Sequence, residues 1–121
     1  MILVDTSIWI DHLRKSDAAV SRLLAQGKIL IHPLIIGEIA VGSFRQREEI
    51  LLRLHGLQTV RSATQDEALR FISHYKLFGL GIGYIDVHLL ASVRLTPGVT
   101  LWTRDKRLAK VAESLNLAFV P

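Results

Sequence analysis

The chain has 121 residues, 50% of them hydrophobic, a formal net charge of +4 at pH 7 and a pI near 9.9. This length fits one domain with a core large enough to need no disulfide or structural metal, and the composition excludes an intrinsically disordered chain. The absence of cysteine excludes disulfides, thiolate catalysis and cysteine-ligated zinc.

The predicted elements alternate between apolar strands and amphipathic helices along the whole chain. The first half is predicted to hold a strand at 1–5, a helix at 7–15, a helix between Asp17 and Gly27, a strand at 28–32, a helix from Pro33 and a helix at 45–55. The second half is predicted to hold a strand at 57–60, a helix at 64–78, a helix from Tyr84, a strand at 99–103, a helix at 105–115 and a strand at 117–120. This alternation indicates a single α/β domain over 1–121, with helices on both faces of a parallel sheet.

Four acidic residues interrupt or follow apolar runs. Asp5 ends the first strand, Asp105 follows the fourth, Glu38 lies in the helix after the second strand, and Asp86 lies in the first turn of the helix before the fourth. Functional sites of open α/β sheets lie beyond the carboxyl ends of the strands, so we expect all four to face one crevice. Buried carboxylates are costly unless their charge is compensated, and oxygen ligands suit Mg²⁺ or Mn²⁺.

Each acid taken alone has a simpler interpretation. Asp5 and Asp105 have the sequence context of helix caps, and Asp86 that of a first-turn acid that complements the helix dipole. Glu38 is harder to explain, because apolar residues flank it on its helix. The prediction therefore depends on the four acids together.

Basic and histidine side chains are further candidates for the site. A rim of cations that hold phosphates is predicted, although each one alone reads as part of a solvated helix face: Arg45, Arg47, Arg104, Lys106, Arg107 and Lys110. The five histidines show no metal-ligand spacing.

At these positions the chain resembles the PIN-domain endoribonuclease toxins of VapBC toxin–antitoxin modules. The resemblance is carried in order by Met1–Ile10, His32-Pro33 with Gly37-Glu38, Gly81–Asp86, and Leu101–Asp105. It implies a PIN-like three-layer sandwich with a five-stranded parallel sheet, and Mg²⁺- or Mn²⁺-dependent cleavage of RNA in the cytoplasm. The family's four acidic positions would be Asp5, Glu38, Asp86 and Asp105.

The resemblance also implies roles for two threonines. Thr103 matches the hydroxyl residue two positions before the last acid, and is expected to hydrogen-bond a carboxylate or a metal-bound water. Two roles are open for Thr6: the same hydrogen bonding from the end of the first strand, or helix capping, which is the simpler interpretation. In-line attack of water on the phosphodiester would leave a 5′-phosphate and a 3′-hydroxyl.

The expected partners are an RNA substrate, a cognate VapB-like antitoxin that blocks the acidic site, and a second copy in a homodimer. The loop Leu77–Ile82 and the region of Ile8 and Trp9 are predicted docking surfaces. We expect no signal peptide and no membrane span, because Asp5 interrupts the apolar start and no apolar run approaches ~20 residues.

Three other functions fit the sequence less well. A haloacid-dehalogenase-type phosphatase needs a second Asp two residues after the first, where this chain has Ser7. A phosphoacceptor receiver domain needs an acid at the end of its central strand, and Val60 to Ser62 offers none. A non-catalytic RNA-binding domain would account for the basic surface but not for the four carboxylates.

Overall fold

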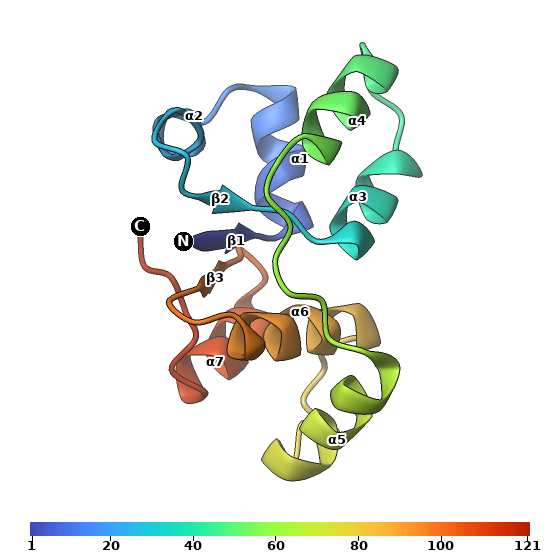
Figure 1. The fold of residues 1–121 in the computed structure, drawn as a ribbon, viewed down its shortest axis with the longest axis vertical. Coiled ribbons are helices and arrows are strands. Elements are labelled where there is room, and N and C mark those ends of the chain that lie inside the picture. Colours follow the sequence, from blue (N-terminus) through green and yellow to red (C-terminus); the bar gives the residue numbers. More distant parts are fainter.

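The computed structural model describes residues 1–121 as a small parallel sheet with seven surrounding helices (Figure 1). The strands are β1 (Ile2–Val4), β2 (Ile29–Leu30) and β3 (Thr100–Trp102). The helices are α1 (Thr6–Arg14), α2 (Ala18–Ala25), α3 (Pro33–Ala40), α4 (Arg47–His55), α5 (Gln65–Tyr75), α6 (Tyr84–Leu95) and α7 (Lys106–Ser114).

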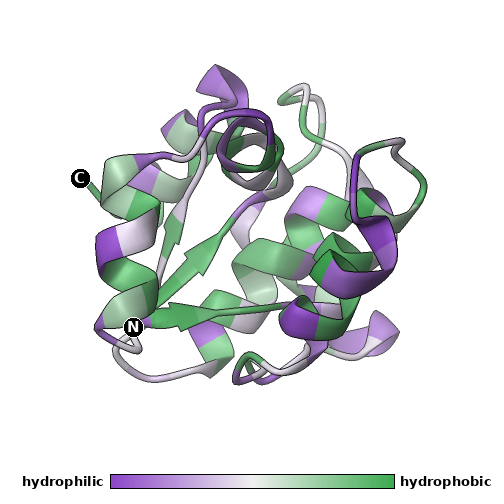
Figure 2. Ribbon diagram, turned by 90° about the horizontal axis from the view of Figure 1, so that it is seen from above, coloured by the Kyte–Doolittle hydropathy of each residue, from purple (hydrophilic) through white to green (hydrophobic).

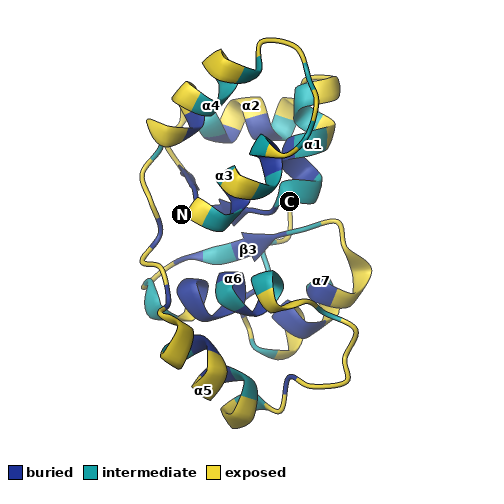
Figure 3. Ribbon diagram, turned by 90° about the vertical axis from the view of Figure 1, so that its right-hand side faces the viewer, coloured by how far each residue is buried: buried dark blue, intermediate teal, exposed yellow.

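The helices form two layers, one on each side of the sheet. Helices α1 to α4 lie on one side and α5 to α7 on the other, as both the front and the side view show (Figures 1 and 3). The chain is therefore an α/β fold with helices on both faces of a parallel sheet, as the alternation of elements predicted. No helix has the length and the apolar character that crossing a membrane would require.

The sheet has three strands in the order β2-β1-β3, all parallel. The prediction of five strands is therefore wrong. The two remaining segments make only isolated parallel bridges, Ile31 with Thr59 and Leu101 with Ala118. Each is joined to its neighbour by two backbone hydrogen bonds, such as Leu101 N to Leu117 O at 2.7 Å. The segments lie where edge strands were expected but are too short to form a ladder.

The central strand is buried along its whole length. Ile2, Leu3 and Val4 are at most 5% exposed, and helices cover both faces of the sheet, which explains why the strand is continuously apolar. Figure 2 shows the strands in the colour of hydrophobic residues, with polar residues on the outer turns of the helices. Since parallel strands share a direction, their carboxyl ends lie at one edge of the sheet.

Several helix ends follow the local signals in the sequence. Asp17 caps α2 by accepting hydrogen bonds from Ala19 N and Val20 N, and Thr64 forms a capping box with Glu67. Two boundaries differ from prediction. Helix α5 ends at Tyr75 rather than near Phe78, because Lys76 adopts a left-handed conformation (φ 55°), and α4 begins at Arg47 after the left-handed Gln46 (φ 57°).

The buried His32 holds the start of α3 in place. Its Nδ1 accepts a hydrogen bond from Leu34 N (3.0 Å), so the neutral ring carries its proton on Nε2, which lies 3.2 Å from Ser92 Oγ. Ser92 Oγ also accepts from Ala63 N and donates to His88 O. Burial, with a smaller contribution from His88, lowers the pKa of His32 to about 4.

We expect His32 to make the fold sensitive to acid. The unfolded chain binds a proton at His32 near pH 6.5, whereas the folded chain does so only near pH 4, so stability falls as pH drops through this window. His32→Asn keeps a capping oxygen and should remove roughly 2–3 kcal/mol of this pH dependence. Urea unfolding at pH 7 and pH 4 measures the loss of unfolding free energy on acidification. An equal loss in the parent protein and the variant would contradict the assignment.

Candidate functional site

Asp5 lies at the carboxyl end of the central strand and is only 6% exposed. Its Oδ1 accepts a hydrogen bond from Thr6 N (2.8 Å), and its Oδ2 accepts from Thr103 Oγ1 (2.7 Å) and Ser7 Oγ (3.2 Å). It is also the N-cap of α1. Three donors from two segments compensate the cost of burying this carboxylate.

Glu38 reaches the same end of β1 from helix α3. Thr6 Oγ1 donates a 2.7 Å hydrogen bond to Glu38 Oε1 across 32 positions of sequence. Of the two roles open for Thr6, hydrogen bonding to a carboxylate is confirmed and the simpler interpretation, helix capping, is wrong: Asp5 caps the helix, and the Thr6 hydroxyl binds Glu38. A helix cap needs only a nearby oxygen, which Asp5 already supplies, so the hydroxyl is left to bind Glu38.

Asp86 lies in the first turn of α6, where its Oδ2 accepts a hydrogen bond from Gly83 N (3.1 Å). Burial raises the pKa of Asp86 above its ordinary value, the hydrogen bond from Gly83 lowers it, and the negative charges of Asp5, Asp105 and Glu38 raise it further. The other three predicted acids therefore act electrostatically on Asp86. Such crowding of negative charge favours a proton or a cation at this place.

Asp105 follows β3 and caps the N-terminus of α7. Its Oδ1 accepts hydrogen bonds from Arg107 N (2.9 Å) and Leu108 N (3.0 Å), and its own backbone N–H donates to Thr103 Oγ1 (3.1 Å). Thr103 thus connects the segment that bears Asp105 to the buried carboxylate of Asp5. Thr103 therefore orients the Asp5 carboxylate through its hydroxyl and is bonded to Asp105 through the backbone of that residue.

The donor set fits a hard cation in its chemistry, although the side chains do not form a closed cage. No three His, Asp or Glu side chains are grouped closely enough to hold a metal ion as they stand. Glu38, Asp86 and Asp105 each keep one carboxylate oxygen without a protein donor. Mg²⁺ commonly takes one or two carboxylates and keeps several waters, so an incomplete protein cage does not exclude it.

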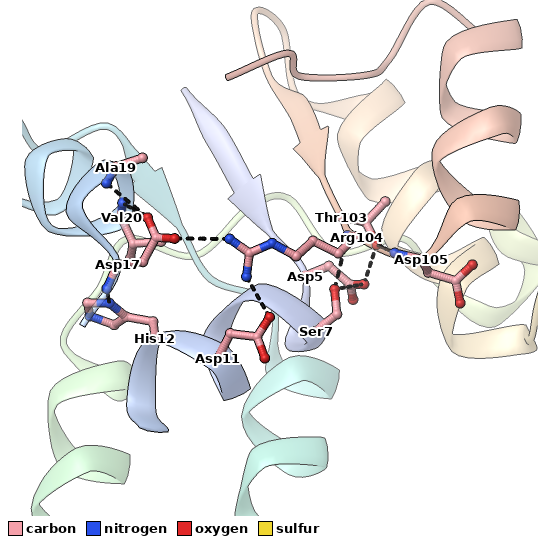
Figure 4. Close-up of polar contacts among 10 residues, drawn as sticks. All are labelled: Asp5, Ser7, Asp11, His12, Asp17, Ala19, Val20, Thr103, Arg104 and Asp105. Carbon is pink, nitrogen blue, oxygen red and sulfur yellow. Dashed lines mark hydrogen bonds and ion pairs between the residues drawn. The ribbon is translucent and has the colours of Figure 1, made fainter. Parts of the chain in front are cut away.

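Arg104 was predicted to hold phosphates, but its guanidinium is occupied by two acids (Figure 4). Nη1 lies 2.6 Å from Asp11 on α1, and Nη2 lies 2.9 Å from Asp17 at the start of α2. The backbone N–H of Arg104 donates to Ser7 Oγ (3.2 Å), and Ser7 Oγ donates to Asp5. Arg104 therefore fastens the segment between Thr103 and Asp105 to α1 and α2.

Sequence reasoning missed Ser7, Asp11 and Arg104 as supporting residues of the site. The only available signal was the position of Arg104 between Thr103 and Asp105, because its ion-pair partners lie 93 and 87 positions away in the chain. Of the other predicted rim cations, Arg47 is also occupied, by Glu48 and by the carbonyl oxygen of Ala40.

Comparison with known proteins adds two findings. The PIN domain family matches residues 2–114. Two relatives, both named Ribonuclease VapC32, come from Mycobacterium tuberculosis strains CDC 1551 / Oshkosh and ATCC 25618 / H37Rv. Each is 50% identical to this chain over 115 residues, which cover 94% of this chain and 93% of the relative.

We expect the ion pairs of Arg104 to stabilise the fold modestly and in a salt-dependent way, because they are partly exposed. Arg104→Gln should lower the midpoint of urea unfolding at low salt and less so at 1 M salt. Asp17→Asn keeps the helix cap and removes only the charge. In the Arg104→Gln background this second change should therefore leave the unfolding midpoint almost unchanged. If the two substitutions lower the midpoint additively, the ion pair is contradicted.

Proposed function

Because this chain belongs to the PIN-domain family and resembles its VapC ribonucleases, we propose that it is a metal-dependent endoribonuclease toxin of a type II toxin–antitoxin module. The proposal rests most directly on Asp86, whose pKa is raised by burial and by three other carboxylates at the same edge of the sheet. A carboxylate whose pKa is raised by burial together with neighbouring negative charge is a pattern typical of functional sites.

We propose that Asp5, Glu38, Asp86 and Asp105 hold Mg²⁺ or Mn²⁺. When bound, such an ion lowers the pKa of water and neutralises charge on the scissile phosphate. The side chains of the protein orient the carboxylates for this role. Thr6 holds Glu38, and Thr103 holds Asp5 while its oxygen accepts the backbone N–H of Asp105.

The proposed reaction is hydrolysis of an RNA phosphodiester bond by in-line attack of water. The bond to the 3′ oxygen breaks, which leaves a 3′-hydroxyl and a 5′-phosphate, and the 2′-hydroxyl takes no part. The expected products therefore differ from those of a ribonuclease that uses the 2′-hydroxyl as its nucleophile. Such an enzyme would rely on general acid–base side chains, whereas the buried His32 caps helix α3.

We propose that a cognate antitoxin binds the cleft beside Trp9. The cleft has a volume of about 300 Å³, and six of its eight lining residues are hydrophobic: Trp9, Leu13, Leu24, Ile50, Leu54 and Leu57. Ile8, the other predicted docking residue, is fully buried and belongs to the core. An apolar, open cleft is the kind of surface in which a partner's amphipathic segment can bury its hydrophobic face. A homodimer remains a prediction from the family resemblance.

The nuclease proposal predicts metal-dependent cleavage that depends on Asp5. Purified protein with Mg²⁺ or Mn²⁺ should cut a total-RNA pool to products with 5′-phosphate ends, and EDTA should abolish this. Asp5→Asn keeps a similar shape and should lower the rate at least 100-fold while the fold survives, as circular dichroism would confirm. Undiminished cleavage by the folded variant, or cleavage in EDTA, would contradict the site.

The antitoxin proposal predicts a separation between binding and catalysis. Ile50→Glu places a charge in the cleft and should abolish co-purification with the co-expressed antitoxin while RNA cleavage remains. Leu52→Glu is a matched control, because Leu52 lies on the same helix, is 73% exposed and does not line the cleft. Equal co-purification of both variants would rule out this docking surface.

A further inference from the structure

Helix α7 carries cations that no acid of the protein neutralises. The four ion pairs of the structure involve Arg47, Arg53 and Arg104, whereas the exposed Lys106, Arg107 and Lys110 make none. Of the basic residues predicted to rim the crevice, Arg47 and Arg104 are therefore already paired, whereas the three on α7 make no ion pair. Unpaired cations beside an acidic site are suited to a polyanion.

Two of these cations, Arg107 and Lys110, line a groove between α7 and the loop that precedes α6. The groove has a volume of about 420 Å³ and is lined by Gly79, Leu80, Arg107, Lys110, Val111 and Ser114. Arg107 lies directly along the loop, since a Cβ atom on Gly81 would come within 2.8 Å of Arg107 Cδ. Gly81 has a φ of 78°, which favours glycine, so the close approach and the turn both depend on this residue.

Both walls of the groove lead to acids of the proposed catalytic site. One wall is the loop that ends at Gly83, whose N–H binds Asp86, and the other is the first turn of α7, which Asp105 caps. Arg107 itself donates its backbone N–H to Asp105. A phosphate placed between Asp86 and Asp105 would therefore have the next stretch of its strand beside Arg107 and Lys110.

The loop wall also exposes apolar side chains. Phe78 is 66% exposed and Leu80 is 45% exposed, immediately beside the groove in sequence. Proteins that bind single-stranded nucleic acid combine a basic groove with aromatic side chains on which bases stack. A duplex would hide its base faces from Phe78, so this combination favours an unpaired strand.

We propose that this groove, formed by residues 78–82 and the exposed side of α7, holds the single-stranded RNA next to the scissile phosphate. Arg107 and Lys110 bind backbone phosphates, and Phe78 stacks on a base. The proposal rests on the proposed ribonuclease function and adds the path that the substrate takes beside the acidic site.

The test is RNA binding without cleavage, measured in the Asp5→Asn background by fluorescence anisotropy of a short labelled single-stranded RNA of mixed sequence. Adding Arg107→Ala and Lys110→Ala should reduce the slope of log affinity against log salt by about 1.4, at ~0.7 for each lost phosphate contact. Adding Phe78→Ala instead should weaken binding about tenfold at an unchanged slope.

The matched control is Arg22→Ala with Lys28→Ala, which removes the same two side-chain types. Arg22 lies on α2 and Lys28 at the amino end of β2, opposite the acidic edge, and both are exposed without an ion pair. This control should keep the parent slope. An equal reduction of the slope in both double variants, or no reduction in either, would overturn the proposal that the groove binds RNA.

Two further outcomes separate the groove from the ribonuclease proposal. If the parent chain cleaves RNA and the groove variants bind and cleave as it does, the groove is wrong and the ribonuclease function stands. If the parent chain shows neither cleavage nor RNA binding, both proposals fail. Duplex RNA of the same sequence should bind more weakly than the single strand, and a preference for the duplex would also overturn the proposal.

Discussion

The cost of burying the Asp5 carboxylate sets the organisation of the site. Asp5 ends a strand that is buried on both faces, and its two oxygens are satisfied only by donors from the start of α1 and from the segment after β3. The register that pairs Val4 with Trp102 delivers Thr103 to this position. A slip of one residue would turn Thr103 to the other side of the sheet and leave Asp5 short of a donor.

Two of the other acids are connected to Asp5 through neighbouring threonines, and the third feels its charge. Thr6 carries the connection to Glu38, Thr103 carries it to Asp105, and the pKa of Asp86 responds to all three charges. This network also bears on the rival functions. A phosphatase of the haloacid-dehalogenase type would use position 7 for acid–base chemistry, whereas Ser7 here bridges Asp5 and Arg104. A purely RNA-binding domain would leave the crowding of negative charge without a purpose.

Much of this arrangement was predictable from the chain, because it depends on local patterns. The apolar runs that end at Asp5 and just before Asp105 indicated the strands, and Thr64 with Glu67 indicated a helix start. Contacts between distant residues were not predictable. The ion pairs of Arg104 with Asp11 and Asp17 join segments that only the folded sheet brings together, and the outer segments were too short to form strands although their composition was right.

Soaking a crystal in Mn²⁺ tests most directly whether the four carboxylates bind a divalent cation. We expect an anomalous scattering peak at the carboxyl edge of the sheet, with oxygens of at least two of Asp5, Glu38, Asp86 and Asp105 bound to the ion directly or through water. A peak elsewhere, or none at saturating Mn²⁺ with the four side chains unmoved, would contradict it. The acids would then be helix caps and structural hydrogen-bond acceptors.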